Sequence, residues 1–185
     1  AFIQHKQLAV GLKGIAKERT LSDVFSQERD GSLINMMELD LLVGSGGVLS
    51  HAPRRQQSMQ MMIDAFQPEG ITRLAVDSIF MMPHLGVLST VNETAATEVF
   101  EKDCMIYLGT CVAPRGKGKK GSQVLSFEME FQNGRREHGT MDVGDLRHFP
   151  LGLNETAKLR ANPAKGWDLG YGSGKPVEAV IHGGV

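Results

Sequence analysis

Continuous apolar runs alternate with helically spaced apolar residues along the first half of the chain. Residues 39–43 are apolar except for Asp40, which is typical of a strand buried within a sheet. Residues 71–76 form a second run of this kind. Between them, apolar residues recur three and four positions apart over 58–66, the spacing of a helix with one inner face. The order of strand, helix and strand predicts a parallel α/β layer.

Residues on either side set the limits of the predicted helix. Ser50 can cap its start and Pro53 suits its first turn, whereas Pro68 and Gly70 end it. The predicted inner face consists of Ser58, Met59, Met62, Ile63 and Phe66. Less regular apolar spacing predicts two further helices, over 7–18 and 80–88.

The pattern changes to period two in the second half of the chain. Over 123–131 one face is apolar and the other carries Val124, Ser126, Glu128 and Glu130, as in a half-buried strand. Asn133-Gly134 is a strong hairpin signal. Thr156–Arg160 predicts one helical turn. Further strands are predicted over 104–113, 139–151 and 177–181, so we expect an α/β part at 1–97 and a β-rich module at 98–185.

Composition excludes several classes of protein. The net charge is −1, which provides no field to attract nucleic acid or acidic lipid. No apolar run approaches the roughly 20 residues that span a bilayer. Cys104 and Cys111 match no common zinc spacing and are expected to be free thiols in a reducing compartment. We therefore expect a cytoplasmic protein with no metal site and no contact with a membrane.

The most informative motif is V-G-S-G-G at 43–47, between the first predicted strand and the helix. Glycine permits positive φ and lets a ligand lie against the main chain, and a helix N-terminus adds partial positive charge. These properties suit a nucleotide. The spacing is neither the dinucleotide fingerprint nor a P-loop. On spacing alone, nucleotide contact and a tight turn without a ligand are equally supported.

Three charged residues follow this motif along the chain and are candidates for its chemistry. Arg54 and Arg55 lie in the first turn of the helix, where cations oppose the helix dipole, so they face either an anionic ligand or solvent. Asp77 ends the second strand, where α/β sheets place functional groups. It either holds a metal-bound water or caps the next helix through the N–H groups of Ser78 and Ile79.

Other polar segments carry weaker signals. Residues 114–122 place four cations in one loop without interleaved aromatic residues, which predicts a solvated hairpin loop rather than a nucleic-acid site. The glycine-rich segment 170–175 fails the P-loop spacing. No serine or cysteine nucleophile has a matching base, so no catalytic residue is assigned.

Three segments together resemble a known family: D-L-L-V-G-S-G-G-V-L-S-H-A-P-R-R at 40–55, I-D-A-F-Q-P-E-G-I-T-R-L-A-V-D at 63–77, and M-M-P-H-L-G-V-L-S at 81–89. They resemble the MutL/GlmL-type accessory proteins of glutamate mutase, which are unrelated to the mismatch-repair MutL. The V-G-x-G-G turn is shared by many ATPases of the actin/Hsp70/sugar-kinase superfamily. The resemblance therefore implies that 1–97 is the end of an actin-like (ribonuclease H-like) nucleotide-binding domain.

The resemblance also implies a site and a partner. It assigns Gly44, Ser45, Gly46 and Gly47 to the adenine and ribose of ATP, with Mg in the full-length protein. Arg54 and Asp77 join them as candidate cofactor-binding residues. The implied partner is a cobalamin-dependent mutase, which the full-length protein reactivates or assists with the use of ATP. Whether the chain forms a homo-oligomer stays open.

One departure from the superfamily limits what this chain can do. The Asp-x-Gly-x-Thr phosphate-binding hairpin is not present in the sequence. We therefore expect a C-terminal fragment that holds half of a nucleotide site and does not hydrolyse ATP alone. The alternative is a non-catalytic interaction module whose β-rich part docks a partner enzyme.

Overall fold

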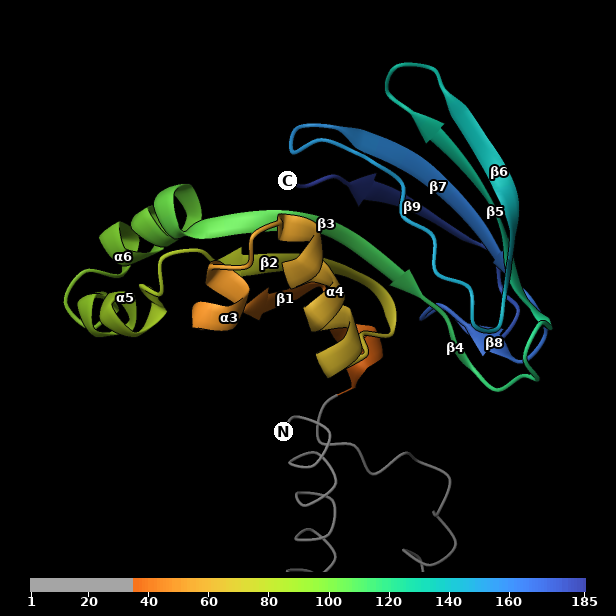
Figure 1. Ribbon diagram of the computed structural model, residues 1–185, viewed down its shortest axis with the longest axis horizontal. Coiled ribbons are helices and arrows are strands. Elements are labelled where there is room, and N and C mark those ends of the chain that lie inside the picture. Colours follow the sequence, from red (N-terminus) through yellow and green to blue (C-terminus); the bar gives the residue numbers. More distant parts are fainter. Residues whose placement is uncertain (1–34) are drawn as a thin grey trace, which may run out of the picture. The chain divides into compact units, whose positions relative to one another are not determined.

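A computed structural model describes residues 35–185, so the helix predicted over 7–18 lies outside the described residues. Residues 37–185 group as one compact unit. Figure 1 shows the helices and strands in chain order: η1 (Met36–Glu38), β1 (Leu41–Gly44), α3 (Gly47–Ser50), α4 (Arg55–Phe66), β2 (Gly70–Asp77), α5 (Met82–Ser89), α6 (Glu93–Val99), the π-helical turn η2 (Phe100–Cys104), β3 (Met105–Ala113), β4 (Arg115–Gly116), β5 (Gln123–Phe131), β6 (Arg136–Asp142), β7 (Thr156–Pro163), β8 (Trp167–Asp168) and β9 (Val177–His182).

The first sheet has the order β1-β2-β3 and is mixed. β1 pairs with β2 in parallel, and β2 pairs with β3 antiparallel. The parallel pair connected through α4 confirms the predicted strand, helix and strand. β3 follows the expected boundary near residue 98 and yet belongs to this first sheet.

α4 packs its apolar side against the first sheet (Figure 1). Met62 is fully buried together with Leu74 and Val76 of β2, as expected when a helix covers the sheet that its flanking strands form. Met59, Ile63 and Phe66 pack against the same cluster. The inner face predicted for this helix is therefore confirmed, and α5 confirms the short helix predicted over 80–88.

Two expectations for this region were wrong in detail. β1 is an edge strand with Leu41 39% exposed, so the strand is present but is not buried. Ser50 does not cap α4, because it ends the separate helix α3 and its hydroxyl donates to the carbonyl of Asp77 at 2.6 Å. The chain breaks helical geometry after Ser50 and restarts at Arg55.

The second sheet has the order β6-β5-β7-β9 and is antiparallel throughout. β5 buries Leu125, Phe127, Met129 and Phe131, as its alternation predicts. Val124 is also buried, against expectation, because the register of β5 shifts between Gln123 and Leu125. The described chain therefore contains a mixed sheet followed by an antiparallel one.

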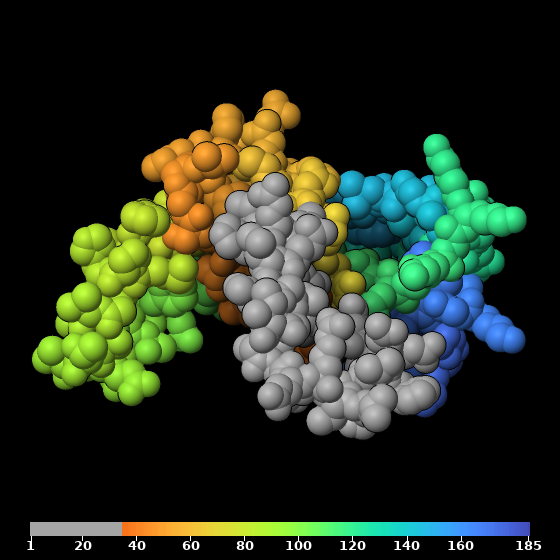
Figure 2. All heavy atoms as spheres, turned by 90° about the horizontal axis from the view of Figure 1, so that it is seen from below, coloured from red at the N-terminus to blue at the C-terminus, as the bar shows by residue number. Residues whose placement is uncertain are grey.

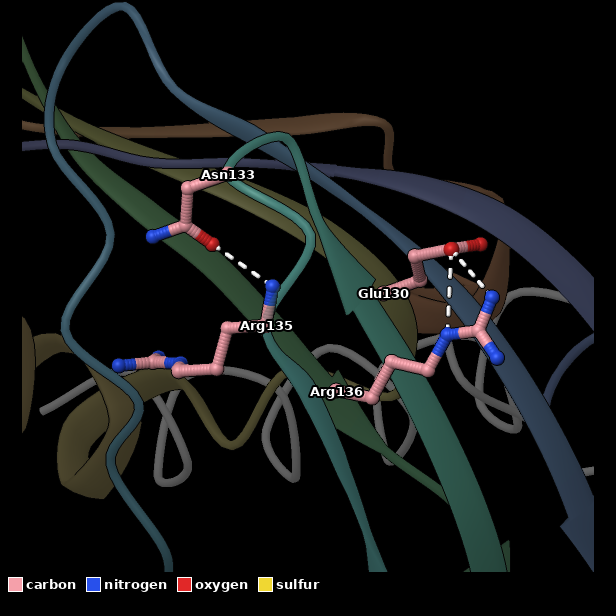
Figure 3. Close-up of polar contacts among 4 residues, drawn as sticks. All are labelled: Glu130, Asn133, Arg135 and Arg136. Atoms are coloured by element: carbon pink, nitrogen blue, oxygen red, sulfur yellow. Dashed lines mark hydrogen bonds and ion pairs between the residues drawn. The ribbon is translucent and has the colours of Figure 1, made fainter.

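The hairpin between β5 and β6 turns at Asn133-Gly134, as predicted. Gly134 has a φ of 80°, and the side-chain oxygen of Asn133 accepts from the N–H of Arg135 at 3.0 Å (Figure 3). Beyond the turn, Arg136 pairs with Glu130 at 2.8 Å on the outer face of the sheet (Figure 3). β6 ends at Asp142, so the strand predicted over 139–151 is shorter than expected.

The helical turn predicted at Thr156–Arg160 was wrong, because the segment belongs to β7. β7 lies between β5 and β9 in the second sheet. Its side chains alternate, with Ala157 and Leu159 buried and Lys158 exposed. Pairing on both edges outweighs the helix propensity of these residues.

The segment after β9 runs beside β3. The carbonyl of His182 accepts from the Thr110 hydroxyl at 2.9 Å, and the N–H of Val185 donates to the carbonyl of Tyr107 at 3.1 Å. These contacts connect the second sheet to the first. None of the helices in the described residues is long and apolar enough to cross a membrane.

Candidate functional site

The glycine turn between β1 and α3 contains glycines with different roles. A Cβ on Gly44 would lie 2.6 Å from Leu49 Cδ1 and 3.0 Å from Met62 Sδ. Gly44 is itself buried and therefore allows α3 and α4 to pack closely on β1. The tight-turn interpretation explains this first glycine without a ligand.

Gly46 and Gly47 leave an open face. Gly46 has φ 107° and ψ 154°, a region that is essentially restricted to glycine, and no atom of the other described residues lies within 4 Å of the position of a Cβ there. Gly47 is exposed, and its nearest atom would be His51 Cδ2 at 3.9 Å. Among the described residues, the Cβ positions of Gly46 and Gly47 therefore have no contact closer than this one, which leaves room for a flat ligand packed against the backbone.

Asp77 lies beneath this turn at the end of β2 and is fully buried. One carboxylate oxygen accepts from the N–H of Met81 at 3.1 Å. The other accepts from the N–H of Met82 at 3.0 Å and from the hydroxyl of Ser45 at 3.3 Å. The carboxylate therefore connects the glycine turn directly to the start of α5.

Opposing effects set the pKa of Asp77. Burial acts to raise the pKa, but hydrogen bonds from the N–H groups of Met82, Met81 and Ile79 and from Ser45 outweigh it. The pKa lies below the ordinary value of 3.8. Asp77 is therefore ionised at neutral pH and acts as a hydrogen-bond acceptor.

Of the two roles considered for Asp77, the structure shows the capping of the next helix. The N–H groups of Met81 and Met82 are its partners, whereas the N–H of Ser78, which was expected to take part, donates to the carbonyl of Cys104 at 2.9 Å. Both carboxylate oxygens thus accept hydrogen bonds from the chain itself. Among the described residues, no group of three or more His, Cys, Asp and Glu side chains could hold a metal ion.

Two buried serines, whose roles were not predicted, hold the turn in place. Ser50 donates to the carbonyl of Asp77, and Ser58 of α4 donates to the carbonyl of Leu49 at 2.8 Å. Both serines are at most 5% exposed. The sequence signal for Ser58 was a polar residue on the inner face of a helix, because a buried hydroxyl requires a partner.

The two arginines of the helix start differ in their surroundings. Arg55 donates to the carbonyl of Ser50 at 3.0 Å, so it stabilises the connection between α3 and α4. Arg54 is exposed, and its guanidinium forms no ion pair or hydrogen bond within the described residues. Of these two arginines, Arg54 is therefore the one whose guanidinium is available to an anionic group.

The loop between Asp77 and α5 has an unusual backbone. Phe80 has a φ of 58°, which a non-glycine residue with a bulky side chain rarely adopts. Phe80 is 52% exposed, and its neighbour Ile79 is 57% exposed. The yellow-green segment in Figure 2 contains this loop together with α5 and α6. Sequence reasoning missed this feature, because an apolar run does not show which residues will face solvent.

Comparison with known proteins adds one finding. A family model described as MutL protein matches residues 2–104, which is more than half of the chain. The chain belongs to the MutL protein family. Membership implies a protein associated with glutamate mutase. No curated protein and no solved structure matched the chain.

The matched range contains the whole candidate site. The glycine turn, Arg54 and Asp77 all lie within it, as do α5 and α6. β3 and the entire second sheet lie beyond residue 104. The family match therefore covers the glycine turn and the flanking segments on which the resemblance was based. It does not extend to the β-rich part of the chain.

Proposed function

We propose that this MutL-family chain supplies the adenosine side of a nucleotide site in an ATP-dependent accessory protein of a cobalamin-dependent mutase such as glutamate mutase. The fold of this part is then the end of an actin-like nucleotide-binding domain. The observation that carries the proposal is the open, glycine-restricted backbone at Gly46 and Gly47. Family membership supports the partner.

The geometry of the turn suits a purine better than a charged small molecule. An adenine ring is flat and largely apolar, so it packs on a backbone that has no Cβ above it. Gly46 and Gly47 offer such a surface. The exposed guanidinium of Arg54 is the candidate for the nucleotide's phosphates. ATP brings its own phosphates and Mg, for which the described residues show no cluster of ligands.

The same arrangement provides a route from nucleotide to partner. A ligand on Gly46 contacts the backbone next to Ser45, whose hydroxyl donates to Asp77. Asp77 in turn holds the first N–H groups of α5. Val87 of α5 and Val91 just after it are exposed by 71% and 87%, which suits contact with another protein. In this proposal the nucleotide alters the position of α5 and so the contact with the mutase.

The test compares two glycines that both have room for a side chain. Gly47→Val in the full-length protein places a branched side chain on the proposed adenine surface without requiring positive φ. We expect the Kd for ATP to rise at least about tenfold, which corresponds to roughly 1.4 kcal/mol. Binding is measured by isothermal titration calorimetry.

Gly86→Val is the matched control, because Gly86 is an exposed helical glycine and, outside its own helix backbone, no described atom lies within 4 Å of its Cβ position. It should leave the affinity for ATP unchanged. Gly46 is less suitable, since any side chain there strains the backbone. If Gly47→Val binds ATP as tightly as Gly86→Val does, the proposed adenosine site is wrong.

A further inference from the structure

A cleft separate from the glycine turn lies between α4, β3 and the inner face of the second sheet. Its volume is about 420 Å³, within the range of small-molecule sites. Residues 146–152 form one wall, and Phe149 of this loop packs edge-on against Phe127 of β5, with ring centroids 5.5 Å apart. None of the glycine-turn residues lines the cleft, and neither does Asp77.

Most of the lining is apolar. Met59 and Ile63 of α4 face the cleft from one side, and Val112 of β3 contributes to its floor. Phe127 and Phe131 line it from the second sheet. A ligand that fills this space therefore needs an apolar body, because polar groups would lose water without gaining partners.

The charged lining is of one sign. Arg147 is the charged side chain among the described lining residues, and neither aspartate nor glutamate lines the cleft. Arg147 forms no ion pair within the described residues, and its guanidinium lies 6.0 Å from the centroid of the Phe127 ring. His148 and His182 also line the cleft. An anionic group at Arg147 thus meets a cation that has no aspartate or glutamate side chain beside it in the described lining.

We propose that this cleft binds an amphipathic monocarboxylate, with its hydrocarbon part against Phe127 and Phe131 and its carboxylate at Arg147. The apolar lining favours a ligand with a hydrocarbon body. The guanidinium of Arg147, which forms no ion pair within the described residues, favours a carboxylate at the end of that ligand. The site does not depend on the proposed nucleotide function, because the two sets of residues do not overlap.

Cys111 provides a reporter inside the cleft. Cys111 is one of the residues that line the cleft, and burial raises the pKa of its thiol to about 11. Cys104 is fully buried and does not line the cleft. Alkylation with N-ethylmaleimide at mildly alkaline pH, located by fragmentation mass spectrometry, therefore reports on access to Cys111.

The probe is decanoate, with decanol as its uncharged counterpart. At about ten times its Kd, decanoate should slow the alkylation of Cys111 by roughly tenfold, because a bound chain blocks access. Arg147→Gln should raise the decanoate concentration for half-protection at least about fivefold and leave decanol unaffected. Arg136→Gln removes a cation from the outer face of the same sheet and should change neither value.

Three results would overturn this proposal. The first is no protection of Cys111 by decanoate at about 1 mM, where binding would be no stronger than roughly −4 kcal/mol. The second is the same decanoate concentration for half-protection in the wild type and in Arg147→Gln, which would show that the carboxylate does not bind at Arg147. If Cys111 does not react with N-ethylmaleimide, the unfolding temperature of the wild type is measured with and without decanoate. The third contradicting result is then an unfolding temperature that decanoate does not raise.

Discussion

Asp77→Ala is expected to lower the free energy of unfolding by about 2–4 kcal/mol. The change removes a fully buried carboxylate that accepts hydrogen bonds from Ser45, Met81 and Met82. Donors left without a partner each cost about 1–3 kcal/mol, less where water enters the space. Urea unfolding followed by the fluorescence of Trp167, the single tryptophan, measures the loss.

Asn92→Ala is the matched control for the capping role. Asn92 caps α6 at an exposed position, where its side chain accepts from the N–H of Ala95 at 3.0 Å. Its removal should cost about 1 kcal/mol. If Asp77→Ala costs no more than Asn92→Ala, the carboxylate is not the buried link between the turn and α5 that its contacts indicate.

The same aspartate should influence acid unfolding. Its folded pKa lies below 3.8, so the folded state favours the carboxylate more than the unfolded chain does. The resulting stability is fully present above about pH 5 and is lost as the pH falls below about 3.9 and through the folded pKa. Over that interval of pH, the free energy of unfolding should therefore fall less for Asp77→Asn than for the wild type. An equal fall in the two proteins would contradict this expectation.

Gly184→Ala is expected to lower the free energy of unfolding by about 1–3 kcal/mol. A Cβ at Gly184 would overlap the backbone of Leu108 and Gly109, which cannot move aside as a flexible side chain would. The N–H of Gly184 also donates to the carbonyl of Leu151 at 3.0 Å. The substitution therefore separates this segment from β3, and thermal unfolding measures the effect.

Gly86→Ala is the control, since Gly86 lies in α5 and none of the described residues outside this helix comes within 4 Å of its Cβ position. Alanine there should raise stability by about 0.4–1 kcal/mol, because it restricts the unfolded chain and favours the helix. A destabilisation by Gly184→Ala no larger than about 0.5 kcal/mol would show that the close contact with β3 relaxes freely.

Local patterns predicted the elements around the candidate site well. The apolar runs and the spacing of three and four residues located β1, α4 and β2. In each element the apolar residues recur with the period of its buried side. The same reasoning failed at β7, where Ala157, Lys158 and Leu159 are good helix formers in an alternating pattern. Their state depends on pairing with β5 and β9, which no local window contains.

The position of the candidate site could be predicted from the sequence, but the separate roles of its residues could not. The glycine turn was predicted, yet the difference between Gly44, which is enclosed by Leu49 and Met62, and Gly46, which is open, depends on the packing of two helices. Asp77 was placed at the end of its strand. Its partner Ser45 lies 32 positions earlier, so no spacing rule could pair them.

Photolabelling tests the central claim most directly. The full-length protein is irradiated with an ATP analogue that carries an azide on the adenine ring, digested with trypsin and analysed by mass spectrometry. We expect a label on the tryptic peptide 30–54, which contains the glycine turn, and we expect unlabelled ATP to suppress it. Labelling that is confined to other peptides, or that unlabelled ATP does not suppress, would contradict the adenosine site at Gly46 and Gly47.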